Sequence, residues 1–142
     1  MTDLLTFIVV AVTLFKKSSK DRITVVAAGI TLHEALKAYS QLHKIGTSCR
    51  IVDAYSVAPL DLHTLLKAHR EVGPLLVVED HYDGGGLGDA VSSALSPYGA
   101  RVHHLAVTNV PHSGKPEDTL KRAGIDSEGI VRKVKEILSN DA

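Results

Sequence analysis

The sequence has little cysteine, few aromatic residues and no surplus of charge. Its only cysteine, Cys49, excludes an internal disulfide and any metal site built on paired cysteines. A single thiol fits a reducing compartment, so the cytoplasm is the expected location. The 16 Lys and Arg residues balance the 16 Asp and Glu residues. Because no excess positive charge is available to hold a polyanion, nucleic-acid binding is not expected. A chain of 142 residues fits one domain.

The chain also lacks an apolar run long enough to cross a membrane. Its most hydrophobic stretch, residues 4–15, is shorter than the ~20 residues that a membrane helix needs. Asp3 stands where a secretory signal carries basic residues. Residues 7–15 are rich in β-branched side chains, which predicts a buried strand. This strand is the candidate for an extra edge strand of the sheet. Residues 1–17 are therefore an atypical N-terminal segment, and residues 18–142 are the expected domain.

From Arg22 onward, short β-branched runs alternate with longer stretches of helical spacing. This alternation is typical of an α/β fold. Strand runs that are apolar on both faces favour a mostly parallel sheet with helices on each side. The sequence therefore predicts a three-layer α/β/α sandwich. The four expected internal strands are residues 23–28, 49–53, 75–80 and 102–107.

Local signals place the helices. Thr31 and Glu34 have the spacing of a capping box, and Gly46 is placed to end the first helix. Further helices are expected over about residues 60–70 and 87–95. The apolar face of the first helix is predicted to comprise Leu32, Ala35, Leu36, Tyr39 and Leu42.

Two more helices are expected near the C-terminus. Pro116 suits the first turn of a short helix that ends near Gly124. Asp126 can cap the final helix. The side chains of that helix expected to point into the core are Ile130, Val134, Ile137 and Leu138.

The richest candidate site follows the third predicted strand, where ligands of open α/β sheets tend to bind. Acids beside a histidine could form an acid/base site, with Asp80 and His81 as the pair. Glycine amides ahead of a helix could instead bind an anion. The preferred interpretation is structural: the glycines allow close packing, while Glu79 and Asp80 bind loop amides or a neighbouring chain. The candidate residues of this anion or interface loop are Glu79, Asp80, His81, Gly85, Gly86 and Gly88.

Other candidates have simpler interpretations. Lys115, in the loop 109–116, could touch a phosphate, although a shaped connection is the preferred interpretation. His81 with either His103 or His104 could bind a metal, but no helical His pair or second cysteine supports such a site. Cys49 is expected to be inert core. The sequence contains no dinucleotide fingerprint, phosphate loop or serine-hydrolase elbow.

Four segments occur in the order found in one known family. They are TVVAAGITLHEAL at 24–36, VEDHY at 78–82, GGLGDAVSS at 85–93 and VPHSGKP at 110–116. Together they resemble the C-terminal domain of animal-type transketolase, over about residues 19–138. The resemblance implies a five-stranded mixed sheet whose first strand, residues 7–15, is an antiparallel edge strand. It also implies the third module of a homodimeric, cytoplasmic enzyme of the pentose phosphate pathway, which moves a two-carbon ketol unit between sugar phosphates.

The departures from the family matter as much as the match. The family holds thiamine diphosphate with Mg²⁺ or Ca²⁺ through a Gly-Asp-Gly motif followed by Asn-Asn, and this chain has neither motif. Its activating glutamate and sugar-phosphate ligands come from earlier domains. We therefore assign no catalytic, cofactor-binding or metal-binding residue to this chain. His112 stands where close relatives have arginine, and residues 1–17 do not resemble the preceding family sequence, which suggests a fragment, an alternative product or a truncated gene.

Two functional hypotheses follow. The first is a C-terminal module of a transketolase, inactive alone, with a structural, dimerisation or regulatory role and with the missing domains or a second copy of the chain as partner. The alternative is a stand-alone domain that binds an anion or small ligand through residues 84–88 and the amides near Thr31. An independent enzyme that uses Asp80 and His81 is a third, less supported idea.

Overall fold

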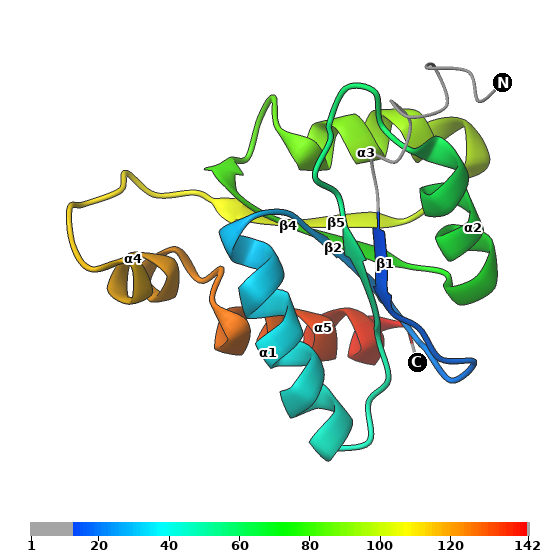
Figure 1. The fold of residues 1–142 in the computed structure, drawn as a ribbon, viewed down its shortest axis with the longest axis horizontal. Helices are drawn as coiled ribbons and strands as arrows, with labels where there is room; N and C mark the ends of the chain where they lie inside the picture. The colour runs from blue at the N-terminus through cyan, green and yellow to red at the C-terminus, as the bar shows by residue number, and fades with distance from the viewer. Residues whose placement is uncertain (1–12, 142) are drawn as a thin grey trace, which may run out of the picture.

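The computed structural model describes residues 13–141 (Figure 1). The strands within this range are β1 (Thr13–Lys16), β2 (Thr24–Ala27), β3 (Arg50–Asp53), β4 (Leu75–Tyr82) and β5 (Val102–Val107). The α-helices are α1 (Ile30–Lys44), α2 (Leu62–Val72), α3 (Leu87–Leu95), α4 (Pro116–Ala123) and α5 (Ser127–Asn140). Strands and helices therefore alternate through most of the described chain. No helix in residues 13–141 is long and apolar enough to span a membrane.

The strands form one sheet in the order β1-β3-β2-β4-β5. β3, β2, β4 and β5 pair in parallel, and β1 pairs antiparallel with β3. The α/β fold with a core of parallel strands is thus the one that the sequence predicted. Most of the strand predicted at residues 7–15 lies outside the described residues.

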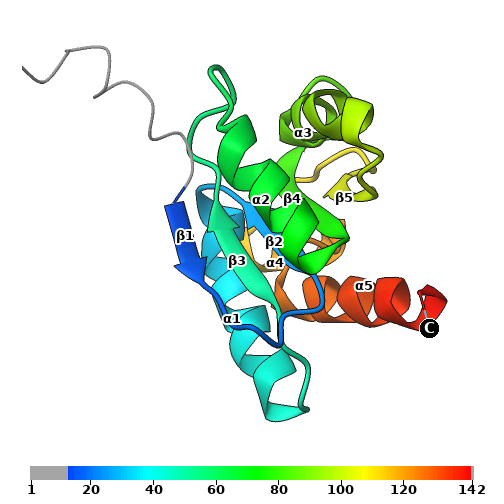
Figure 2. The same ribbon diagram turned by 90° about the vertical axis from the view of Figure 1, so that its right-hand side faces the viewer.

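Helices cover both faces of the parallel strands (Figure 2). α1 and α5 pack on one face and enclose one apolar core, whose members include Leu42, Leu76 and Val134. α2 and α3 pack on the other face around a second core that includes Leu65, Val77 and Val91. β-branched and leucine side chains fill both sides of β2 and of the first four residues of β4, because neither face of these segments meets water.

Several helix ends follow the sequence signals. α3 has the predicted bounds, Leu87–Leu95. Pro116 opens α4, and Gly124 ends it with φ 71°. Asp126 caps α5 by accepting a hydrogen bond from the Gly129 amide at 3.0 Å. The side chains predicted to point inward from α5 are all buried: Ile130, Val134, Ile137 and Leu138.

The predicted capping box of α1 is wrong. Gly29 is the N-cap, with φ 59°, and no side chain caps this end. Thr31 lies inside the helix, and its buried hydroxyl lies 3.0 Å from the Val78 carbonyl of β4. The Glu34 carboxylate instead accepts a hydrogen bond from the Ser127 amide at 2.8 Å. Thr31 therefore ties α1 to β4, and Glu34 ties α1 to the start of α5.

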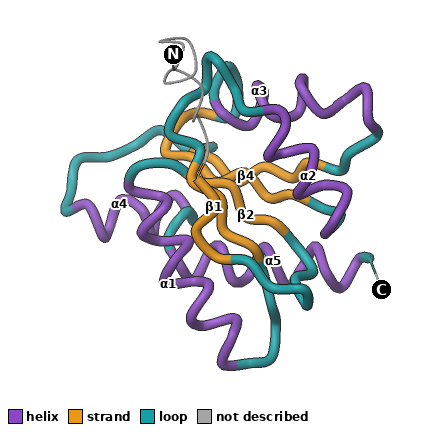
Figure 3. The backbone as a smooth tube through the Cα atoms, turned by 45° about the vertical axis from the view of Figure 1, so that its right-hand side comes forward, coloured by secondary structure: helices purple, strands orange, loops and turns teal. Residues whose placement is uncertain are grey.

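The carboxyl ends of the parallel strands contain a topological switch point. β2 leads through α1 to β3 on one side, whereas β4 leads through α3 to β5 on the other side of the sheet (Figure 2). β2 and β4 are neighbours (Figure 3), so the two connections run in opposite directions from them. Ligands of open α/β sheets bind preferentially outside such a point.

Candidate functional site

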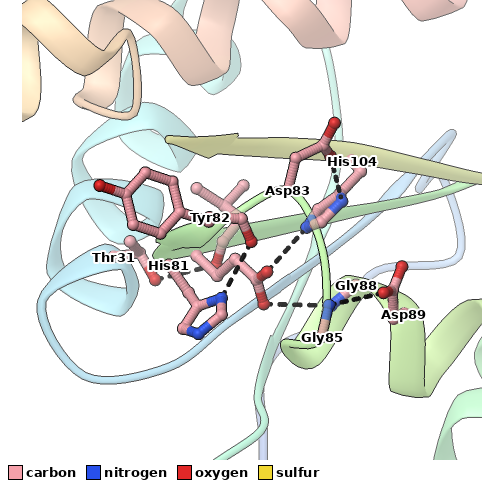
Figure 4. A network of polar contacts seen from close by, with 10 residues as sticks. Thr31, His81, Tyr82, Asp83, Gly85, Gly88, Asp89 and His104 are labelled. Carbon is pink, nitrogen blue, oxygen red and sulfur yellow. Dashed lines mark hydrogen bonds and ion pairs between the residues drawn. The ribbon is translucent and has the colours of Figure 1, made fainter. Parts of the chain in front are cut away.

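A buried carboxylate organises the carboxyl end of β4 (Figure 4). Glu79 is only 5% exposed. One of its oxygens accepts a hydrogen bond from the Gly88 amide of α3 at 3.1 Å. The other lies 3.0 Å from Nε2 of His104 on β5. Because a buried carboxylate is costly unless its oxygens are bonded, these two contacts explain how the fold accommodates Glu79.

His104 continues this network toward the surface. Its Nδ1 lies 3.1 Å from the carboxylate of Asp83, whose side chain is exposed. The imidazole thus stands between a buried and an exposed carboxylate, and only the imidazolium form can donate to both. We name Glu79, His104 and Asp83 the carboxylate–histidine chain. The sequence offered no local sign of it, because Glu79 and His104 lie on different strands.

The glycines after β4 allow backbone and side chains to approach closely. A Cβ added to Gly86 would lie 2.5 Å from a Glu79 carboxylate oxygen, and one added to Gly88 would overlap the His104 ring. The Gly85 amide donates to the Asp89 carboxylate at 2.6 Å. The amides of Gly85 and Gly88 are therefore already bonded within the chain. These contacts support the structural interpretation of the glycine-rich segment over free anion-binding amides.

Asp80 and His81 are not brought together as an acid/base pair. β4 extends to Tyr82, two residues beyond its predicted end, so successive side chains point to opposite faces. Asp80 lines a cavity on the side of α1 and α4. The His81 ring instead bonds the Tyr82 carbonyl through Nδ1 at 2.9 Å.

The remaining sequence candidates are the histidines proposed as metal ligands and Cys49. No group of three or more His, Cys, Asp or Glu side chains in the described part of the chain has the arrangement of a metal site. His104 is held by carboxylates, and Nε2 of His103 is buried without a hydrogen-bond partner. Cys49 is 1% exposed, and burial, followed by the nearby charge of Asp21, raises the pKa of its thiol to about 12. This is the environment of an inert core cysteine.

A cavity of about 540 Å³ lies outside the carboxyl ends of β2, β4 and β5. The loop between β5 and α4 contributes Asn109, Val110, Pro111 and His112 to the lining, and α4 contributes Arg122. Lys115 is not among the lining residues. Sequence reasoning treated this loop as a connection and missed the cavity. The signal in the sequence was Val110, an apolar residue in a polar loop. In the structure the Val110 side chain is 77% exposed.

Comparison with known proteins agrees with this architecture. The sequence model of the family described as "Transketolase, C-terminal domain" matches residues 13–130. "Transketolase-like protein 1" of Bos taurus is 50% identical over 125 residues, which are 87% of this chain and 21% of that protein. "Transketolase" of Mus musculus is 46% identical over 87% of this chain and 20% of its own length. This chain thus spans about a fifth of these relatives.

Solved structures show the same fold. A chain titled "Split gene transketolase, inactive beta4 tetramer" superposes with a TM-score of 0.83 and 33% identity, over 90% of this chain and 42% of that chain. The transketolase of Campylobacter jejuni superposes with a TM-score of 0.66 and 20% identity, over 89% of this chain and 18% of that one. The second likeness bears on the fold alone. In both structures the matching part lies within a longer polypeptide.

Proposed function

The chain belongs to the transketolase C-terminal domain family, and from this premise we propose that it is an assembly module, inactive alone. Its partner would be the remaining domains of a transketolase, or a second copy of the chain, in the cytoplasm. Two-carbon ketol transfer between sugar phosphates would then be an activity of the complete enzyme. The relatives are about five times longer than the part that matches, which supports a role inside a larger assembly.

The observation that carries the proposal is an apolar face at the carboxyl edge of the sheet. Most of the large hydrophobic side chains that are exposed in the described residues lie at or just beyond the carboxyl ends of the parallel strands. Exposed apolar side chains concentrated at one edge of a sheet favour an interaction surface there. We name this set the carboxyl-edge face: Ile30, Tyr55, Val57, Tyr82 and Val110.

The proposal places the thiamine diphosphate and its divalent metal in the other domains. Mg²⁺ and Ca²⁺ bind oxygen ligands, chiefly carboxylates, and the described residues contain no cluster of three acidic or histidine side chains that would hold an ion. Glu79, the buried carboxylate, is already bonded to Gly88 and His104. The described residues therefore do not fit the divalent metal of that cofactor. Calorimetric titration with thiamine diphosphate and Mg²⁺ is expected to show no saturable binding, and a saturable isotherm would contradict this assignment.

Sedimentation of the 142-residue chain, alone and mixed with mouse transketolase lacking its matching C-terminal part, tests the assembly role. We expect self-association or a mixed complex. Tyr82→Lys should weaken that complex at least about tenfold, because a buried charge replaces an apolar contact. Ile45→Lys is the matched control, since Ile45 is 55% and Tyr82 54% exposed but Ile45 lies at the other end of α1. A chain that stays monomeric and binds nothing would overturn the proposal.

A further inference from the structure

The cavity outside β2, β4 and β5 has the position and size of a small-molecule site. Ile30 follows β2 and Asp80 belongs to β4, so the cavity opens at the switch point between these strands. Its volume of about 540 Å³ lies within the range of about 300–1,000 Å³ that is typical of ligand pockets. Neither the glycine-rich segment nor the carboxylate–histidine chain contributes a residue to its lining.

The walls of the cavity are mainly apolar and come from separate elements. Leu120 and Ala123 line it from α4, and Val107 lines it from the end of β5. Ile125, which is 1% exposed, contributes a wall from the turn between α4 and α5. Such walls favour the apolar part of a ligand by removing it from water.

The polar groups at the cavity indicate the charge of the ligand. Arg122 lines it from α4 and forms no ion pair with any side chain in residues 13–141. His112 and Asn109 add groups that can donate hydrogen bonds. Asp80 is the acidic residue of the lining, and its carboxylate can accept a hydrogen bond from a hydroxyl or amine group. An unpaired guanidinium beside an apolar cavity favours a carboxylate or phosphate, which it can bind through two parallel hydrogen bonds.

We propose that this cavity binds a small apolar molecule, a ring or short chain, that carries one anionic group. The apolar part lies against Ile30, Val107 and Leu120, and Arg122 pairs with the anion. Ile30 and Val110 also belong to the carboxyl-edge face, so a ligand here would lie beside the proposed docking surface. The ligand proposal does not depend on docking, because it concerns the chain without a partner.

A matched pair of probes tests the site. Naphthalene-2-carboxylate and naphthalene-2-carboxamide have the same rings and differ in charge. Methyl NMR of the 142-residue chain should show saturable shifts of Ile30, Val107 and Ile125 with the carboxylate, while Leu65 in the second core stays unchanged. The carboxylate should bind about tenfold tighter than the amide, the size expected for one charge-assisted hydrogen-bonded pair.

Two variants on the same helix identify the anion-binding group. Arg122→Gln should abolish the preference for the carboxylate, whereas Lys121→Gln, an exposed neighbour that does not line the cavity, should keep it. Equal affinity for both probes in the unmodified chain would overturn the proposal. Shifts spread over the carboxyl-edge face, with no saturation, would identify a nonspecific apolar surface and would also overturn it. The docking experiment is read by sedimentation without these probes, so either proposal can fail alone.

Discussion

The Glu79 carboxylate lies 3.0 Å from Nε2 of His104, joining β4 to β5 across 25 residues of sequence. The same carboxylate accepts the Gly88 amide at the start of α3. One buried acid therefore fixes two strands and a helix at the carboxyl edge of the sheet. This geometry also explains the glycines, because the His104 ring occupies the space that a side chain at position 88 would need.

Gly88→Ala is expected to destabilise the protein by about 2–4 kcal/mol, measured by urea unfolding, because the new methyl overlaps the His104 ring. Adding His104→Ala removes the ring that clashes. The double variant should therefore lose less stability than the sum of the single losses, by about 1 kcal/mol or more.

Gly84→Ala is the control for this pair, because an added Cβ at Gly84 meets no atom within 4 Å. Its unfolding free energy should stay within about 0.5 kcal/mol of the unmodified protein. Strict additivity of Gly88→Ala and His104→Ala would show that the two positions do not compete for space.

Glu34→Ala should cost about 1–2 kcal/mol, because it removes the acceptor of the Ser127 amide at the start of α5. Lys37 should also lose its raised pKa, which arises from its hydrogen bond to Glu34 and then from the charge of Glu34. Urea unfolding and NMR titration of Lys37 measure the two effects.

Glu128→Ala is the control, because Glu128 is an exposed acidic residue in the first turn of α5. This substitution should cost no more than a few tenths of a kcal/mol. Equal losses in both variants would contradict this capping role of Glu34.

The parts of the fold that local signals specify were predictable. Asp126 and the spacing of Ile130, Val134 and Ile137 define α5 from neighbouring residues alone. The last two residues of β4, His81 and Tyr82, were not predicted, because they stand between acidic residues and a glycine-rich segment, a pattern typical of a loop. Tyr82 belongs to the strand through its pairing with Val107 of β5, and a local window contains no sign of that partner.

Long-range polar contacts explain why the site was only partly predicted. The sequence pointed to Glu79 and the glycines, and the contact between Glu79 and the Gly88 amide is of the kind expected. It gave no reason to place His104 beside them. Glu34 has the spacing to cap its own helix, yet its acceptor oxygen serves Ser127, 93 residues away. The cavity likewise needs β2, β5 and α4 together, and each contributes side chains that look ordinary in sequence.

The native Cys49 thiol should react slowly with a disulfide reagent such as 5,5′-dithiobis(2-nitrobenzoate). The side chain is 1% exposed, and a pKa of about 12, against 9.0 for the ordinary thiol, lowers the thiolate fraction at pH 8 by about three orders of magnitude. The absorbance assay should show full reaction in 6 M guanidinium chloride and, under native conditions, a rate at least about a hundredfold lower. Equal rates in the two solvents would contradict the core assignment.

His103 should make the protein less stable in mild acid. Burial is the main cause that lowers the pKa of its imidazole below 6.5, and the surrounding Asp141, Lys133, Arg101 and Glu136 modify it with opposing signs. The folded state therefore binds fewer protons than the unfolded state as the pH falls through 6.5, so the free energy of unfolding must fall over that window.

His103→Leu removes the titrating group. Its stability should decrease less between pH 7.5 and pH 5.5 than that of the unmodified protein, by roughly a few tenths of a kcal/mol because the ring is only partly buried. Urea unfolding at both pH values measures this difference. The exposed His33→Gln variant should keep the original pH dependence, and a His103→Leu variant that kept it too would show that the imidazole does not contribute.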